Sequence, residues 1–258
     1  MTQSPQDPTD ESDDESSQTK RREGKPRSFW RELPILILVA LVLSFLLQTF
    51  VARVYLIPSE SMEPTLHGCT GCTGDRIVVE KIGYRFGDPE PGDIVVFRGP
   101  DSWNDEFVSQ RSDNSVIRGA QEVGSLIGVV APDENDLVKR VIATGGQTVE
   151  CCDAEGRVLV DGKPLDEPYI QMDFPFSPGT MTCETELKSG RCFDPVTVPE
   201  GNIWVMGDNR SNSRDSRYHV TDEFTGTVPV DNVIGKAIFI ALPPSRTGIL
   251  HSPDIQGR

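Results

Sequence analysis

Two serines that lie one residue apart between two prolines are the side chains in this sequence best placed to do chemistry. They occur in the stretch Pro58-Ser59-Glu60-Ser61-Met62-Glu63-Pro64-Thr65-Leu66. A serine hydroxyl becomes a nucleophile when a neighbouring base removes its proton, and it can then attack a carbonyl carbon. A lone serine in a loop is more often a turn residue or a helix cap. The presence of a base therefore decides whether Ser61 is catalytic.

Two residues are candidates for that base. His67 follows Ser61 closely, but it lies in a turn rich in Gly, Cys and Thr, and proximity in sequence does not make a catalytic pair. Lys139 lies in the apolar run Leu137–Ile142, where alternate residues of a strand share a face, so its neighbours on that face are Leu137 and Val141. An apolar surrounding can lower the pKa of a lysine by up to ~3–5 units, which would make Lys139 a base near neutral pH. A lysine that extends to solvent from a sheet edge is equally compatible with this strand.

A third polar segment, Gly207–Arg217, follows the apolar run Ile203–Met206. Its alternating charges and small hydroxyls are typical of a solvated loop. They could equally form a polar network that holds a site. Spacing alone leaves both interpretations open.

The first element that must position these segments is an uncharged apolar run from Leu33 to Ala52. Its length is about the ~20 residues that a helix needs to cross a bilayer. A cleaved signal peptide usually has a shorter apolar run, and a core helix is rarely apolar on all faces. Only Arg53 lies close after the run, whereas a basic cluster precedes it, formed by Lys20, Arg21, Arg22, Lys25, Arg27 and Arg31. This bias predicts that the N-terminus is cytoplasmic and that the chain after Ala52 lies outside the cell.

The predicted organisation is therefore a cytoplasmic tail at 1–28, a transmembrane anchor at 29–53 and an extracytoplasmic domain at 54–258. The tail begins with an acidic segment that is too poor in apolar residues to fold, so it is expected to be disordered. The whole chain has a net charge of −15, with 40 acidic against 25 basic residues, which argues against nucleic acid as a partner.

Short β-branched runs alternate with Gly, Pro and Asp in the outer domain, which favours a mainly β fold. The expected strands are Asp75–Lys81, Asp93–Arg98, Leu137–Thr144, Thr148–Cys151, Arg157–Val160, Ile203–Met206 and Ile234–Ala241. Asp161-Gly162 is a strong signal for a tight hairpin turn. Insertions are expected at 99–136, where Gly99–Asn114 should be a surface loop and Gly119–Val130 either a helix or a strand pair, and at 151–200. The chain after Pro243 is expected to be loose.

The six cysteines all lie on the predicted outer side, where disulfides persist. Cys69-Thr70-Gly71-Cys72 looks like half of a zinc site, but the sequence has no second such pair and its histidines fall in no ligand spacing. Disulfides are therefore favoured over a metal. Cys183–Cys192 and Cys69–Cys72 are the preferred pairs.

Four segments together resemble the bacterial type I signal peptidases, which are membrane-bound serine proteases. The nucleophile motif of that family reads Pro-Ser-x-Ser-Met-x-Pro-Thr-Leu, and every fixed position is met at residues 58–66. The other motifs follow in the family's order, at Gly92–Phe97, Lys139–Gly146 and Gly207–Arg217. With its single N-terminal anchor, the chain resembles Gram-positive and actinobacterial members. It departs from the family pattern at Ser211, where the family often has Asp, and altered loop packing is expected there.

The resemblance implies a role for each matching residue. Ser61 would be the nucleophile of a Ser–Lys dyad and Lys139 its general base. Ser59 would join the Ser61 backbone N–H in the oxyanion hole, and Ser213 would orient the lysine amine. An ion pair and its neighbours would support the site, formed by Asp208, Arg140, Asp215 and Arg217.

The implied reaction is removal of N-terminal signal peptides from exported preproteins after Ala-x-Ala-like sites. Small residues would fit shallow apolar pockets near Ile57, Pro58, Met62, Leu66, Leu137 and Val138. The expected partners are signal peptides, membrane lipid and, by proximity, the secretion machinery, and neither a metal nor an organic cofactor is expected. The alternative is a membrane-anchored, β-rich binding domain without catalysis. A self-cleaving Ser–Lys repressor relative fits less well, because such proteins lack an anchor and oxidised cysteines.

Overall fold

The computed structural model describes residues 29–69, 71–103, 112, 114–126 and 136–257. The predicted tail at 1–28 and most of 104–135 lie outside the described residues. The described chain contains two α-helices, five short 3-10 helices and two antiparallel sheets, which confirms the prediction of a mainly β fold with one N-terminal apolar helix.

Helix α1 (Phe29–Phe50) contains the apolar run from Leu33 as far as Phe50. Its 22 residues extend about 33 Å at the α-helical rise, which matches the ~30 Å hydrocarbon core of a bilayer. The stretch Glu32–Phe50 has a mean hydropathy of 2.5. Its large apolar side chains from Ile35 to Phe50 are exposed on the protein. The helix ends earlier than predicted, because Ala52 and Arg53 already belong to the first strand.

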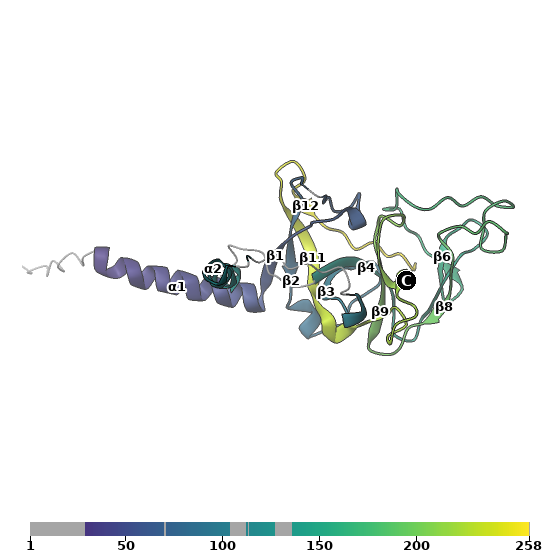
Figure 1. The fold of residues 1–258 in the computed structure, drawn as a ribbon. Coiled ribbons are helices and arrows are strands. Elements are labelled where there is room, and N and C mark those ends of the chain that lie inside the picture. The colour runs from purple at the N-terminus through teal and green to yellow at the C-terminus, as the bar shows by residue number, and fades with distance from the viewer. Residues whose placement is uncertain (1–28, 70, 104–111, 113, 127–135, 258) are drawn as a thin grey trace, which may run out of the picture. The chain divides into compact units, whose positions relative to one another are not determined.

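The larger sheet has the strand order β1-β2-β11-β3-β4-β9-β10, and β12 pairs with β11 (Figure 1). Its strands are β1 (Ala52–Leu56), β2 (Arg76–Glu80), β3 (Ile94–Arg98), β4 (Asp136–Thr144), β9 (Asn202–Met206), β10 (Val228–Pro229), β11 (Val233–Leu242) and β12 (Gly248–Ile249). These strands pair antiparallel with one another.

The smaller sheet has the order β7-β6-β5-β8. Its strands are β5 (Thr148–Cys151), β6 (Val158–Val160), β7 (Lys163–Pro164) and β8 (Phe193–Thr197). The predicted turn at Asp161-Gly162 joins β6 to β7, and both residues have positive φ, 52° and 74°. A two-residue hairpin needs this left-handed backbone, which Asp and Gly tolerate. The hairpin prediction is therefore confirmed.

The centre of the larger sheet is covered on both faces. Ile94 and Val96 of β3 enter one buried cluster, whereas Val95 and Phe97 enter another. A strand that is buried on both sides needs apolar residues at every position, so it shows no alternation of polar and apolar residues. This explains why β3 appears in the sequence as a continuous apolar run.

The predicted strands agree with β2, β3, β4, β5, β6, β9 and β11 to within a residue at each end. The short strands β1, β7, β8, β10 and β12 were not predicted. In the first insertion the ambiguous segment is a helix, α2 (Ser115–Leu126), and residues 127–130 lie outside the described part. The surface-loop prediction for 99–114 is wrong at Trp103, which is buried, stacks on His219 and meets Phe97 edge-on.

The prediction of a loose chain after Pro243 is also wrong. Ile255 is only 1% exposed and packs in the core with Ile142 and Trp204. Gln256 donates through Nε2 to the Ile142 carbonyl oxygen at 3.0 Å, so the C-terminal segment lies beside β4 (Figure 1). Short apolar runs separated by prolines gave no periodic pattern, and only the tertiary fold shows that this segment covers the sheet.

Candidate active site

Ser61 lies in a short 3-10 helix, Glu60–Met62, close behind strand β1. Met62 and Leu66 hold this segment on the domain because both side chains are buried in the same apolar cluster. The hydroxyl-bearing residues stay at the surface, where Ser59 is exposed and Ser61 is half-buried. The apolar positions of the motif therefore anchor the segment, and its serines remain accessible.

Strand β4 brings Lys139 to this segment. Its Nζ donates to Ser61 Oγ at 2.7 Å, across 78 residues of sequence. Lys139 is 4% exposed, and β4 lies inside the sheet between β3 and β9, so the side chain does not extend to solvent from an edge. Ser59 Oγ lies 3.3 Å from Ser61 Oγ. The structure thus places the candidate nucleophile between a buried amine and a second hydroxyl.

The surroundings of Lys139 favour its neutral form. Burial lowers the pKa of its amine to about 8, although the nearby carboxylates of Asp215 and Asp208 act in the opposite direction. The charge of Arg217 lowers this pKa a little further. An amine with this pKa is partly neutral near pH 7 and can accept the proton of a hydroxyl group.

The backbone after β9 holds the nucleophile segment from the other side. The N–H of Asn209 donates to the Ser61 carbonyl oxygen at 3.2 Å, and Asn209 Nδ2 donates to the Glu60 carbonyl oxygen at 3.2 Å. A Cβ atom on Gly207 would lie 2.4 Å from that Ser61 oxygen, which is closer than real Cβ contacts allow. A residue with a side chain at 207 would therefore push the Ser61 backbone away. Sequence reasoning missed this role of Gly207 and Asn209, although both stand in the Gly-Asp-Asn motif.

Asp215 and Arg217 form a buried pair next to this turn. Arg217 donates to both carboxylate oxygens of Asp215, and the Gly207 N–H donates to the same carboxylate at 2.9 Å. Burial acts to raise the pKa of Asp215, but the guanidinium of Arg217 and these hydrogen bonds hold the pKa below its usual range. The ionised carboxylate thus fixes the backbone at Gly207, which packs against Ser61.

Arg140 and Asp208 form a second pair, which is almost completely buried. Arg140 Nε and Nη2 bind the two carboxylate oxygens at 2.9 and 2.7 Å, and its Nη1 donates to the Gly92 carbonyl oxygen at 2.7 Å. The hydroxyl of Thr65 donates to the same carboxylate, and the guanidinium lies 3.9 Å from the centre of the Tyr169 ring. Thr65 therefore links this pair to the nucleophile segment, a contact that the sequence did not suggest.

Ser213 lies close to the site but does not make the expected hydrogen bond. Its hydroxyl is buried, packs against Gly207 and has no hydrogen-bond partner among the described residues. The predicted role of Ser213 in orienting the amine of Lys139 therefore stays a prediction.

The residues predicted to line the substrate pockets fall into two groups. Ile57, Met62 and Leu66 are at most 3% exposed and belong to the apolar core. Pro58 is exposed, and Leu137 and Val138 are half-buried. Only the second group offers surface to a peptide in this conformation, and the role of all six stays a prediction.

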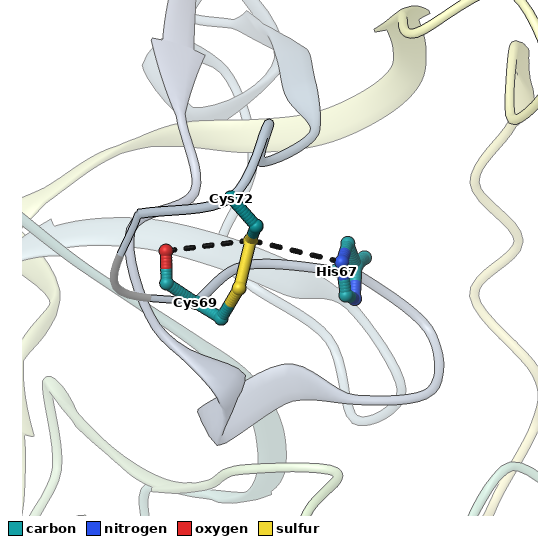
Figure 2. A group of neighbouring side chains, drawn as sticks. All are labelled: His67, Cys69 and Cys72. Carbon is teal, nitrogen blue, oxygen red and sulfur yellow. Dashed lines mark hydrogen bonds between the residues drawn. A yellow bond between two sulfur atoms is a disulfide. The ribbon is translucent and has the colours of Figure 1, made fainter.

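The other candidate base, His67, contacts Glu63 and Cys72 in this structure. Its Nδ1 lies 2.5 Å from Glu63 Oε1, and its Nε2 lies 3.8 Å from Cys72 Sγ (Figure 2). Cys72 is joined to Cys69, and Cys183 to Cys192, which confirms both predicted disulfides. The adjacent residues Cys151 and Cys152 form the third.

Comparison with known proteins shows the family of this chain. Residues 30–242 match the family described as signal peptidase, peptidase S26. The chain belongs to this family. Signal peptidase I of Mycobacterium tuberculosis is 53% identical over 258 residues, which cover 96% of this chain and 85% of the relative. The probable signal peptidase I of Mycobacterium leprae is also 53% identical, over 91% of this chain and 83% of the relative.

More distant members of the peptidase S26 family align over similar lengths. The probable signal peptidase I-1 of Synechocystis is 39% identical, over 88% of this chain and 90% of the relative. A solved signal peptidase I from Enterococcus faecalis aligns at 22% identity with a TM-score of 0.32, over 58% of this chain and 97% of that one, which is too weak a likeness to bear on the fold. Membership in the peptidase S26 family makes the chain a serine hydrolase. The mycobacterial relatives confirm its actinobacterial character.

Proposed function

We propose that this protein is a membrane-bound endopeptidase that removes N-terminal signal peptides from exported preproteins by a Ser–Lys dyad. The observation that carries the proposal is the 2.7 Å contact between Lys139 Nζ and Ser61 Oγ at a lysine that is only 4% exposed. A nucleophile and a base within hydrogen-bond reach, with the base desolvated, are what hydroxyl activation requires.

The reaction is acyl transfer in two stages. Neutral Lys139 accepts the proton of Ser61 as Oγ attacks the carbonyl carbon on the N-terminal side of the scissile bond. Ser59 Oγ and the Ser61 N–H donate to the oxyanion, and the protonated amine then gives its proton to the leaving amine. Water next attacks the acyl-enzyme, with Lys139 again as the base. Neither a metal nor an organic cofactor takes part in these steps.

The substrate is an extended peptide with small side chains near the cleavage site, as in Ala-x-Ala. Such a peptide can add a strand to an exposed sheet edge. Strand β1 is an edge strand of the larger sheet, and the segment with Ser59 and Ser61 follows it directly. Half-buried Leu137 and Val138 lie on the strand that carries Lys139, and with exposed Pro58 they would form shallow walls that reject bulky residues.

The helix α1 would hold this site at the outer membrane surface, because Ser61 follows its end at Phe50 closely. Lipid and, by proximity, the secretion machinery are the partners that this location implies. A signal peptide is itself a membrane segment as it leaves that machinery. Anchoring the peptidase in the same membrane raises the local concentration of its substrate.

Cleavage of a model preprotein by the detergent-solubilised protein tests the proposed function. The new N-terminus should follow an Ala-x-Ala site, and the Ser61→Ala protein should leave the preprotein intact. Binding without cleavage by the unmodified protein would instead support the alternative, a β-rich binding domain.

We expect activity to rise with pH as the amine of Lys139 loses its proton. The amine must lose its proton to act as a base, so kcat/KM should increase as the pH passes about 8 and then level off, because burial lowers the pKa of Lys139 to about 8. The measurement is kcat/KM on a peptide substrate across this range. A rate that keeps climbing to pH ~10, where a solvated lysine titrates, would contradict the buried-base mechanism.

We also expect the N-terminus to be cytoplasmic and the domain after α1 to lie outside. The basic cluster before Leu33, which includes Arg27 and Arg31, motivates this orientation. Protease added outside spheroplasts should digest the domain and spare a tag at residue 1. Digestion of the tag in intact spheroplasts would contradict this topology.

A further inference from the structure

The loop that follows the nucleophile segment carries three side chains that the proposed peptidase reaction does not use. His67, Cys69 and Cys72 each offer one ligand atom, and these atoms all lie within 4.8 Å of one another (Figure 2). His67 and Cys69 are half-buried and Cys72 is exposed, so the group is open to solvent on one side. We propose that this group, once its disulfide is reduced, is a Zn²⁺ site with an imidazole and two thiolate ligands and one position open to water.

The histidine already has the tautomer and the orientation of a metal ligand. Its Nδ1 lies 2.5 Å from Glu63 Oε1. A carboxylate only accepts hydrogen bonds, so Nδ1 must carry the hydrogen, and in the neutral ring the lone pair is then on Nε2. That lone pair is on the side of the cysteines, where Nε2 lies 3.8 Å from Cys72 Sγ. Metal-binding histidines usually donate their other N–H to a carboxylate in this way.

The spacing also suits a tetrahedral zinc ion. With Zn–N near 2.0–2.1 Å and Zn–S near 2.3 Å, neighbouring N and S ligands lie about 3.6 Å apart and two S ligands about 3.8 Å apart. The distance between His67 Nε2 and Cys72 Sγ is already close to the first value. The two sulfurs are bonded to each other in this structure, so they must separate by about 1.7 Å to reach the second value.

The loop that carries the three ligands is held by hydrogen bonds and close packing at both ends and is exposed at its tip. The His67 N–H donates to Asp75 Oδ2, and the Asp75 N–H donates back to the His67 carbonyl oxygen, both at 2.8 Å. Gly68 and Gly74 pack so closely on the Ile57 carbonyl oxygen that neither has room for a Cβ atom. In contrast, residues 71–73 are exposed. The backbone that carries the imidazole is therefore held on the domain, whereas Cys72 lies on an exposed part of the loop.

The chemical step is a reduction followed by an exchange of protons for metal. A dithiol reductant supplies two electrons and two protons, which break the Cys69–Cys72 bond and leave two thiols, and the reductant becomes a disulfide. When Zn²⁺ binds, the two thiol protons pass to solvent and the thiolates coordinate the ion. The proposal does not depend on the peptidase activity, because none of these residues belongs to the dyad or to the oxyanion hole.

Zinc titration of the full-length protein in detergent tests the proposal. The protein is reduced mildly with dithiothreitol, alkylation of a sample verifies that Cys69 and Cys72 are the free thiols, and Zn²⁺ is titrated without oxygen against a chromophoric chelator. The reduced chain should bind one more Zn²⁺ than the oxidised chain. Co²⁺ in place of Zn²⁺ should show a thiolate charge-transfer band. A reduced chain that binds no more Zn²⁺ than the oxidised one, or a cobalt complex without that band, would overturn the proposal.

Variants distinguish this site from the other cysteines. Glu63→Gln should weaken Zn²⁺ binding by roughly 10–100-fold, and His67→Ala should weaken it more. Both keep the disulfide, so they remain informative even if a protein without Cys69 and Cys72 fails to fold. His251→Ala removes an exposed histidine outside the group and should leave the affinity unchanged.

The second cysteine group needs its own control, because Cys152, Cys183 and Cys192 also lie within 4.8 Å of one another. The Cys183→Ser/Cys192→Ser protein should retain full zinc binding after mild reduction. If it loses zinc binding, or if His67→Ala binds as tightly as the unmodified protein, the ion sits elsewhere and the proposal is wrong.

Discussion

Replacing either Ser61 or Lys139 with alanine is expected to lower kcat/KM for a preprotein or peptide substrate by about 10⁴–10⁶-fold. The nucleophile and its base act as a unit, so removing one leaves the other without a partner in the reaction. Their side chains are already in contact at 2.7 Å. For the same reason the double variant should be no less active than either single variant.

Conservative substitutions of the base should fail as well. Lys139→Arg keeps a positive charge, but a guanidinium is not deprotonated near neutral pH and cannot accept the serine proton. Lys139→His has a shorter side chain than lysine, so its ring would not reach Ser61. Activity is measured with a peptide substrate, and thermal unfolding verifies that each variant is folded.

Matched controls separate the dyad from general effects of substitution. Lys163→Ala and Ser245→Ala remove exposed side chains outside the site and should retain full activity. Turnover like that of the unmodified protein in Lys139→Ala would contradict the dyad and would make His67 the candidate base again.

The second large effect is expected on stability, at the buried pair of Arg140 and Asp208. Asp208→Ala should lower the free energy of unfolding by about 3–5 kcal/mol, because it leaves the guanidinium of Arg140 buried without its carboxylate. Arg140 and Asp208 are 1% and 0% exposed, so water cannot replace the lost partner. Urea unfolding of the solubilised protein, followed by tryptophan fluorescence, measures the change.

Two further variants show whether the unpaired charge is the cause. In Arg140→Leu/Asp208→Leu neither charge of this pair remains, so this protein should be more stable than Asp208→Ala. Arg157→Ala removes an exposed arginine with carboxylate partners and should change the stability little. A destabilisation by Asp208→Ala no larger than that by Arg157→Ala would show that the buried pair does not stabilise the fold.

Some features of this protein follow from short stretches of sequence alone. An uncharged apolar run of membrane length predicts α1, because crossing a bilayer depends on local composition and length. Asp161-Gly162 predicts the hairpin between β6 and β7, because a two-residue turn depends on the backbone freedom of its own residues. The family motifs at 58–66 and 207–217 predicted the peptidase class, which the family match confirms.

Other features depend on segments that are far apart in the sequence, so only the tertiary structure decided them. The sequence could not say whether Lys139 was buried or extended from an edge, because that depends on β3 and β9, which lie on either side of β4. Likewise, nothing local in the chain after Pro243 shows that Ile255 packs on Ile142. Whether a side chain is buried depends on the segments that pack against it. In a sheet with this strand order, most of these segments come from distant parts of the chain. The same reason applies to Gly207. A side chain is excluded at this position only because the folded chain brings it against Ser61.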